Sequence, residues 1–242
     1  MPVFPVQTLP DTEGRFPLTE TDRRHLKVLR LGPGSILEVS FPDRRRAKAR
    51  ILESPQGWLG QLVGTSQPLP DEVLPLWLGC GIVKPQRMDW LMEKCTELGL
   101  WRFSPLYLQY TRQQPSRPLS EQRLIRWRKL AAETLKQCER GVAPEIQSPQ
   151  SLKEWLEQTE SLSGGKYFLQ ARGDAPLLAR LKPAAGLQHA LLVGCEGGLS
   201  DPEVEAAIGA GFQAVSLGPG VFKTETAALI AAALLQQNMR IP

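Results

Sequence analysis

Residues 191–232 read LLVGCEGGLSDPEVEAAIGAGFQAVSLGPGVFKTETAALIAA, and this stretch decides the fold. Two mostly apolar runs, 191–193 and 214–217, each end at a turn that contains glycine. Between them, residues 200–203 read SDPE, a capping box that typically opens a helix. The stretch therefore predicts two consecutive units of strand, turn and helix.

The two glycine turns, at residues 194–198 and 218–220, predict one ligand pocket. Glycine has no Cβ, so backbone N–H and C=O groups can approach a ligand closely where a glycine turn follows a strand. A third strand candidate ends at Leu169 and Gln170, which form another wall if the sheet is parallel. We therefore expect a ligand that is held mostly by backbone groups.

From residue 76 onward, strand-like runs alternate with helical patterns. Pro85 suits a first helical position, Gly99 supplies a helix stop, and Ser120 and Ser151 are helix N-caps. Such alternation is typical of an α/β domain with a mainly parallel sheet. The upstream strand candidates are residues 76–83, 101–110 and 166–170.

The first part of the chain has a different pattern. Short apolar stretches, such as residues 25–30, are broken by turn residues, and residues 47–52 alternate at period two. This pattern predicts a small β-barrel or sheet. Residues 67–71 read QPLPD, which is typical of a linker, so we expect one domain over residues 1–70 and a second over residues 71–242.

Composition argues against several classes of protein. No run approaches the roughly 18 apolar residues of a membrane span, and the N-terminus lacks the layout of a signal peptide. We therefore expect a cytoplasmic protein without membrane contact. The cysteines are scattered and the chain has only two histidines, so we expect no metal site. The four cysteines are Cys80, Cys95, Cys138 and Cys195.

The net charge of the chain is +4, and its distribution is uneven. Basic side chains exceed acidic ones over residues 1–140, whereas acidic side chains are in excess over residues 141–242. A basic region beside a pocket-forming region suits an enzyme with a polyanionic substrate, of which nucleic acid is the commonest. A solvated basic surface without a partner is the alternative on charge alone.

Several kinds of active site are disfavoured by the motifs. Neither glycine turn matches the dinucleotide fingerprint or the phosphate-binding loop. The G-x-S-x-G motif is missing, and His25 and His189 are the only histidines, which disfavours a nucleophile–histidine triad.

Four segments of the chain together resemble the RsmE family of ribosomal RNA small-subunit methyltransferases. They read HLKVLRLGPG over residues 25–34, KPQRMDWLMEKCTELG over 84–99, LVGCEGG over 192–198 and LGPGVFKTETA over 217–227. The resemblance spans nearly the whole chain in the right order.

The resemblance implies a fold and an activity. It implies a PUA-like RNA-binding β-barrel at the N-terminus, followed by a SPOUT-type catalytic domain whose C-terminal segment forms a trefoil knot. It also implies S-adenosylmethionine as methyl donor, a homodimer, and N3 of a uridine in 16S ribosomal RNA of the small subunit as methyl acceptor.

The resemblance also carries over site residues, position by position. The implied cofactor site is Leu169, Gly194, Glu196, Gly197, Gly198, Leu217, Gly218, Pro219, Thr224, Glu225 and Thr226. The RNA-binding candidates are His25, Arg30, Arg44, Arg45, Arg46, Lys84, Arg87 and Arg112. The chain departs from the family pattern at Lys136, Cys138, Cys195, Gly220 and Lys223, where glutamate, serine, proline, arginine and arginine are usual.

Direct methyl transfer to uracil N3 requires that the site help to remove the N3 proton or stabilise the resulting anion. The pKa of this proton is roughly 9–10, close to that of a phenol. A positioned cation stabilises the anion that forms, and the candidates are Arg140, assisted by Lys223. A helix C-terminal cation is an equal alternative role for Arg140.

Two other functions stay open on the sequence. A catalytically silent RNA-binding protein on the same scaffold would not bind the cofactor. A nicotinamide-dependent oxidoreductase would use a similar strand-turn-helix pattern but lacks its fingerprint here.

Overall fold

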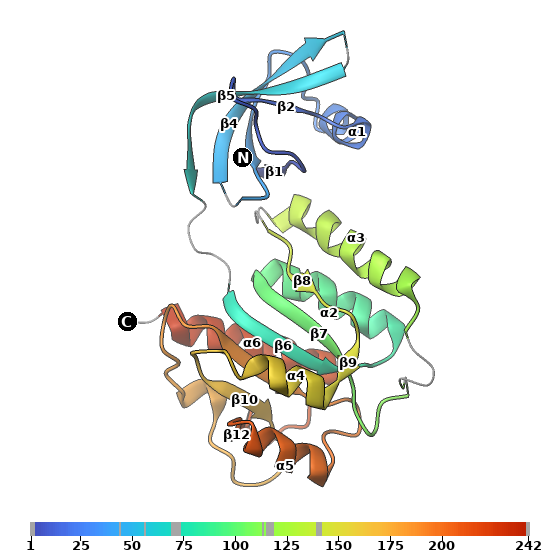
Figure 1. Cartoon of the computed structure of the whole chain (residues 1–242), viewed down its shortest axis with the longest axis vertical. Coiled ribbons are helices and arrows are strands. Elements are labelled where there is room, and N and C mark those ends of the chain that lie inside the picture. The colour runs from blue at the N-terminus through green and yellow to red at the C-terminus, as the bar shows by residue number, and fades with distance from the viewer. Residues whose placement is uncertain are drawn as a thin grey trace. The chain divides into compact units, whose positions relative to one another are not determined.

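The computed structural model describes residues 3–43, 45–55, 57–68, 74–112, 114, 119–138 and 142–240. The chain divides into two compact units (Figure 1). The first comprises Met1–Glu72 and Glu133–Val142, and the second comprises Val73–Ala132 and Ala143–Pro242.

The first unit contains a five-stranded sheet in the order β1-β3-β4-β5-β2. Neighbouring strands are antiparallel except β1 and β3, which are parallel. The rings of Phe16 and Phe41 meet edge to face in its core, with centroids 5.2 Å apart. The strands are β1 (Val3–Pro5), β2 (Arg15–Pro17), β3 (Ile36–Ser40), β4 (Arg45–Ser54) and β5 (Gly57–Pro68).

Helix α1 (Glu20–Val28) differs from the expectation of a purely β region. Thr19 and Asp22 form a reciprocal capping box, in which the Asp22 N–H donates to Thr19 Oγ1 at 3.2 Å and the Thr19 N–H donates to Asp22 Oδ2 at 2.9 Å. Leu26 is fully buried on the inner face of the helix. The T-x-x-D pattern is the signal for this helix in the sequence, because it satisfies the first free N–H groups.

The second unit contains a seven-stranded sheet in the order β12-β10-β11-β6-β7-β8, with β9 also paired to β7. All of its described pairs are parallel. This confirms the predicted α/β unit with a mainly parallel sheet. The strands are β6 (Leu74–Gly81), β7 (Leu100–Tyr107), β8 (Glu145–Ile146), β9 (Gln150–Ser151), β10 (Lys166–Leu169), β11 (His189–Val193) and β12 (Gln213–Val215).

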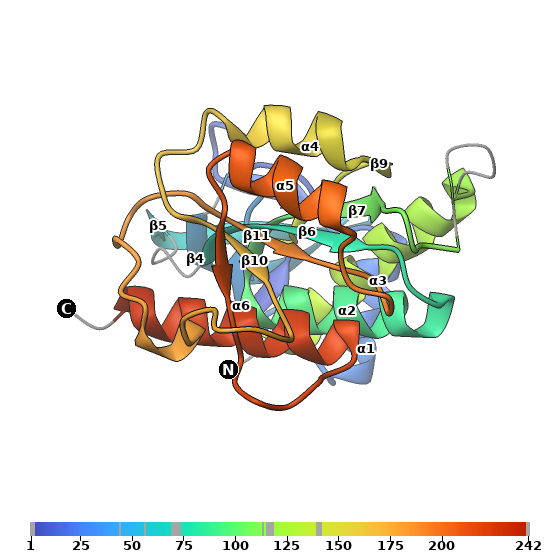
Figure 2. The ribbon, with the colours of Figure 1, turned by 90° about the horizontal axis from the view of Figure 1, so that it is seen from below.

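Helices cover both faces of this sheet, with α2 and α6 on one face and α4 and α5 on the other (Figure 2). Strand β6 serves both layers, because Leu76 and Leu78 pack with the first pair of helices and Trp77 packs with the second. The helices are α2 (Pro85–Leu98), α3 (Glu121–Cys138), α4 (Leu152–Thr159), α5 (Asp201–Gly209) and α6 (Thr224–Arg240), and a 3-10 turn η1 covers Leu178–Arg180.

The predicted helix signals at Pro85, Gly99, Ser151 and Ser200 are confirmed, and Ser120 directly precedes α3. Pro85 starts α2, and Gly99 ends it in the left-handed region at a φ of 75°. Ser151 and Ser200 form capping boxes at α4 and α5. These local devices fix where each helix begins, and therefore where each strand-to-helix turn lies.

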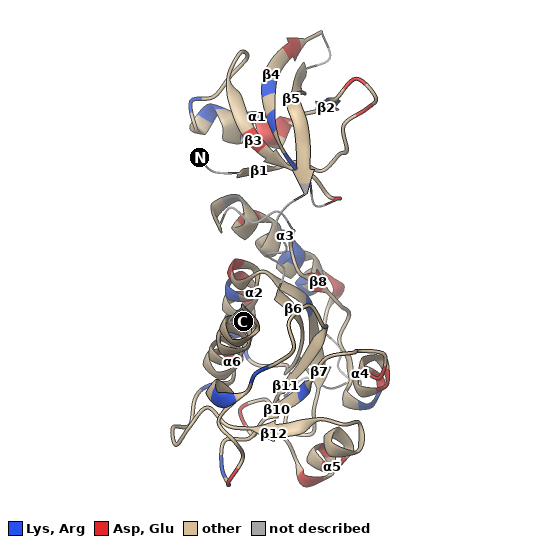
Figure 3. Cartoon of the chain, turned by 90° about the vertical axis from the view of Figure 1, so that its left-hand side faces the viewer, with Lys and Arg blue, Asp and Glu red and all other residues tan. Residues whose placement is uncertain are grey.

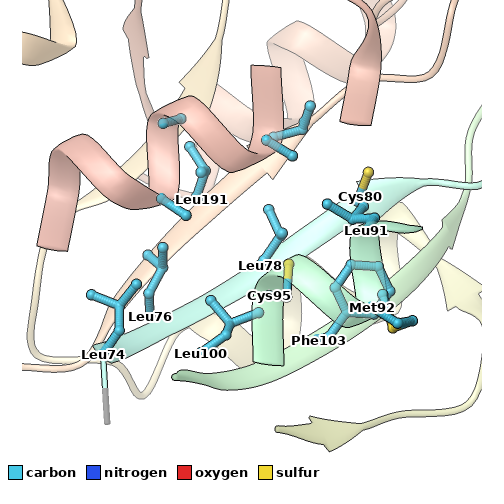
Figure 4. Packing of buried hydrophobic residues seen from close by; sticks show 14 of the residues in the cluster. Leu74, Leu76, Leu78, Cys80, Leu91, Met92, Cys95, Leu100, Phe103 and Leu191 are labelled. Carbon is cyan, nitrogen blue, oxygen red and sulfur yellow. The ribbon is translucent and has the colours of Figure 1, made fainter. Parts of the chain in front are cut away.

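Thiols contribute to the core between β6, α2 and α6 (Figure 4). Cys80 and Cys95 are fully buried beside Leu78 and Met92. Burial raises the pKa of the Cys95 thiol to about 12 and raises the pKa of Cys80 well above its ordinary value. Both side chains are therefore neutral packing groups at neutral pH.

The described part of the chain contains neither a membrane-spanning helix nor a cluster of metal ligands. No helix there is long and apolar enough to span a bilayer. The same residues contain no cluster of three His, Cys, Asp or Glu side chains that could hold a metal ion.

Replacing Gly79 with alanine should destabilise the second unit. A Cβ at Gly79 would lie 2.6 Å from the buried indole of Trp155, which is packed against Trp77 and cannot move without disturbing the core. Such overpacking typically costs about 1–3 kcal/mol, measurable by urea unfolding of the full chain. Gly209→Ala is the control, because its Cβ would meet open space, and it should be neutral or stabilising by about 0.5–1 kcal/mol. Equal effects of the two variants would contradict this packing.

The two buried thiols should react slowly with alkylating reagents, and they should make the stability of the fold fall at alkaline pH. The thiolate is the reactive form, so Cys80 and Cys95 should be alkylated far more slowly at pH 8 in the native protein than in the unfolded chain, as measured by mass spectrometry. A raised pKa in the folded state also means that the thiols stabilise the fold fully below about pH 9. For Cys95, this contribution should be lost as the pH rises toward about 12. Rapid native labelling of Cys95 at pH 8 would contradict the assignment.

Candidate functional site

A pocket lies where three neighbouring parallel strands, β10, β11 and β12, reach their carboxyl ends. It holds about 500 Å³ of empty space, counted out to its open side. In open α/β sheets, this edge is where ligands bind. The residues that line it are Leu169, Gln170, Ala171, Val193, Gly194, Cys195, Gly198, Leu217, Gly218, Gly220, Phe222, Thr224 and Ala227.

The turn after β11 folds back so tightly that one of its positions accepts only glycine. A Cβ at Gly194 would lie 2.6 Å from the carbonyl carbon of Gly198 and 2.9 Å from its Cα. The turn is closed by the Gly198 N–H, which donates to the Cys195 carbonyl at 2.9 Å, with Gly198 in the left-handed region at a φ of 77°. The pocket wall at this turn is therefore made of backbone.

The turn after β12 is held by a serine side chain. The Gly218 N–H donates to Ser216 Oγ at 3.1 Å, and Gly218 has a φ of 106°. The end of β10 is fixed to the same strand, because the Gln170 N–H donates to the Val215 carbonyl at 2.9 Å. These bonds hold the second and third walls of the pocket together.

Six of the eleven residues predicted for the cofactor site line the pocket, and five do not. Those that line it are Leu169, Gly194, Gly198, Leu217, Gly218 and Thr224. Those that are not among its lining residues are Glu196, Gly197, Pro219, Glu225 and Thr226. Gly197 instead packs against Tyr110, since a Cβ there would lie 2.8 Å from the Tyr110 Cβ.

Several lining residues were missing from the predicted set. Val193 and Cys195 flank Gly194, so their position at a strand end was a usable signal. Phe222 and Ala227 flank the start of α6, and only the folded chain brings them to the turns. Burial raises the pKa of the Cys195 thiol, which therefore contributes a neutral, weakly polar surface to the wall.

Arg87, predicted as an RNA contact, is engaged by two carboxylates of its own unit. Its Nη1 donates to Glu196 Oε1 at 3.1 Å, and its Nε lies 3.5 Å from Glu225 Oε1. These three side chains are called the Arg87 cluster below. The guanidinium is thus engaged by carboxylates of its own unit, and the predicted RNA contact of Arg87 stays a prediction.

The other predicted cationic positions differ in their surroundings. Arg44 and Arg140 lie outside the described residues. Lys84, Arg112 and Lys223 are exposed, and Lys223 does not line the pocket.

In the first unit, basic residues lie along strand β4 (Figure 3). Arg45 pairs with Asp43 at 2.6 Å, and Arg46 lies 3.7 Å from Glu38. The ring of His25 packs edge-on against Phe4. Arg30 is exposed and, alone among the described residues other than glycine, has a positive φ, at 59°.

Known proteins resemble the chain along nearly its whole length. Ribosomal RNA small subunit methyltransferase E of Buchnera aphidicola is 28% identical over 222 residues, which cover 90% of this chain and 86% of the relative. The ribosomal RNA small subunit methyltransferase E structure from Neisseria gonorrhoeae, bound to S-adenosyl methionine, superposes with a TM-score of 0.82 at 25% identity, covering 98% of this chain and 97% of that one. A Legionella pneumophila methyltransferase in complex with the cofactor SAM gives a TM-score of 0.78 at 25% identity, covering 98% and 96%.

The resemblance found in the sequence motifs is therefore confirmed. Residues 70–236, well over half of the chain, match the family described as the RNA methyltransferase domain. The chain belongs to this family of RNA methyltransferases.

Proposed function

We propose that this protein is an S-adenosylmethionine-dependent methyltransferase that acts in the cytoplasm on N3 of a uridine in 16S ribosomal RNA. The observation that carries the proposal is a backbone-lined pocket at the carboxyl ends of three adjacent parallel strands in a member of an RNA methyltransferase family. Two solved relatives with the same fold contain S-adenosylmethionine.

The pocket has the chemical character that this cofactor requires. Its glycine turns present backbone N–H and C=O groups, which suit the hydrogen-bonding edge of an adenine. Leu169, Val193 and Leu217 add apolar surface for the rest of the nucleoside. When bound, S-adenosylmethionine supplies a methyl group activated by its sulfonium. The residues around it hold the donor and exclude water.

Calorimetric titration of the full chain should give saturable binding of S-adenosylmethionine and no binding of NAD. Gly194→Ala should weaken the cofactor affinity by roughly ten-fold or more, because the added Cβ would force the wall at Gly198 outward. Gly209→Ala, which adds a Cβ facing open space, should bind like the parent protein. Tight NAD binding, or RNA binding without any cofactor binding, would instead favour an oxidoreductase or a silent RNA-binding protein.

We assign stabilisation of the N3 anion to Arg140, assisted by Lys223. Uracil N3 becomes nucleophilic when its proton passes to solvent water, and a fixed cation beside the base favours that loss by stabilising the resulting anion. Lys223 immediately precedes α6, whose first residue, Thr224, lines the pocket. Because the donor and the base are both held by the protein, proximity supplies much of the remaining rate.

Arg140→Ala should abolish methyl transfer to small-subunit ribosomal RNA while leaving S-adenosylmethionine binding intact. Lys223→Ala should lower the rate less, since it has the supporting role. Transfer is measured with a radiolabelled methyl group, and nuclease digestion followed by mass spectrometry identifies the product as N3-methyluridine. Unchanged turnover in Arg140→Ala would rule out the assignment, and methylation at another atom would rule out the N3 acceptor.

We also propose the finer architecture that the family resemblance implies. The first unit would be a PUA-like RNA-binding barrel, with contacts from His25, Arg30, Arg44, Arg45 and Arg46, and the second unit would add Lys84 and Arg112. The left-handed backbone of Arg30 belongs to the end of α1, where the Leu31 N–H donates to the Leu26 carbonyl at 2.8 Å.

The proposed assembly is a homodimer whose catalytic domain contains a trefoil knot. The non-sequential strand order β12-β10-β11-β6 is compatible with such a chain path. Val221 is 72% exposed and Phe222 is 41% exposed in the segment between the last turn and α6, so a second copy has an apolar surface to cover beside the pocket.

A further inference from the structure

Arg87 lies in the first turn of α2, between two carboxylates that come from distant parts of the chain. Its Nη1 is 3.1 Å from Glu196 Oε1, and its Nε is 3.5 Å from Glu225 Oε1. The next residue, Met88, is fully buried, as is Met92 one turn later. The helix that carries the guanidinium is therefore fixed in the core.

The two carboxylates belong to two different walls of the pocket. Glu196 lies in the turn in which Gly194, Cys195 and Gly198 line the pocket. Glu225 directly follows Thr224, which lines the pocket from the start of α6. A single guanidinium thus joins the turn after β11 to the N-terminal end of α6.

The Glu225 carboxylate is largely buried, and Arg87 is the cation that pairs with it. The Glu225 side chain is 11% exposed, and its Oε2 is buried without a hydrogen-bond partner among the described residues. The Arg87 side chain is 28% exposed, so solvent screens this pair less than it screens a surface pair. Removing Arg87 would take away the paired cation of a largely buried carboxylate and the side-chain link between the two walls.

We propose that Arg87 is a positioning residue for the cofactor pocket, acting through Glu196 and Glu225 and not through RNA. This inference rests on the proposed binding of S-adenosylmethionine in that pocket. The Arg87 cluster holds the two walls at the separation that the cofactor needs. None of its three side chains is among the residues that line the pocket.

The test compares cofactor affinity with RNA affinity in full-length variants. Arg87→Gln should weaken S-adenosylmethionine binding, measured by calorimetry, on the order of ten-fold. The KM for small-subunit ribosomal RNA at saturating cofactor should stay within about two-fold of the parent value. Arg87→Lys should recover part of the affinity, because it keeps the charge and loses the planar fork that contacts two carboxylates.

Arg102→Gln is the control for the loss of an ion pair away from the pocket. Arg102 is 24% exposed, close to the exposure of Arg87, and pairs with the exposed Glu145 at 2.8 Å, and neither residue lines the pocket. Arg102 also stacks on Trp77 and Trp101, so this variant reports general destabilisation as well. This variant should bind the cofactor like the parent protein. A double-mutant cycle with Glu225→Gln adds a second readout, because Arg87→Gln combined with Glu225→Gln should lose less affinity than the two single losses together predict.

Each outcome has one interpretation. Cofactor affinity unchanged in Arg87→Gln, with a raised KM for RNA, would overturn the inference and restore Arg87 as an RNA contact. Equal loss of affinity in Arg87→Gln and Arg102→Gln would also overturn it, since the effect would then be general destabilisation. If the parent protein itself binds no S-adenosylmethionine, the proposed function fails first and the inference fails with it.

Discussion

The parallel pairing of β10 with both β11 and β12 is the constraint on which the site depends. Parallel strands point their carboxyl ends the same way, so the turns that follow these three strands must meet at one edge. The backbones of Gly194 and Gly198 then lie so close together that a Cβ on Gly194 would clash with Gly198. The pocket is a consequence of strand direction and of missing side chains, more than of any reactive group.

This dependence explains what could be predicted from the sequence. The capping box at Ser200 and the stop at Gly99 are local signals, and the structure confirms both. The glycine turns could also be predicted, because a glycine that follows an apolar run typically marks a turn. Helix α1 was missed although Thr19 and Asp22 carry the capping pattern, since its short apolar run looked like part of a β region.

Long-range relations were beyond the sequence. No local pattern shows that β12 pairs with β10 and not with β11, or that Phe222 and Ala227 reach the glycine turns. Arg87 is the clearest case. The resemblance places it among the RNA-binding candidates. Its partners Glu196 and Glu225 are far away in the chain, and only the fold brings them to it. A charged side chain can therefore be identified from the sequence, while its partner cannot.

The strand order also bears on how the protein acquires its site. β11 pairs with β6, and more than a hundred residues separate them in the chain, including all of α2, α3 and α4. Such non-local pairing requires a large loop to close before its contacts can form, which slows folding. Because Ala227 in α6 lines the pocket, no fragment that stops before α6 can form it. The pocket is thus complete only when α6 has packed against the sheet, so it depends on the folding of the whole second unit.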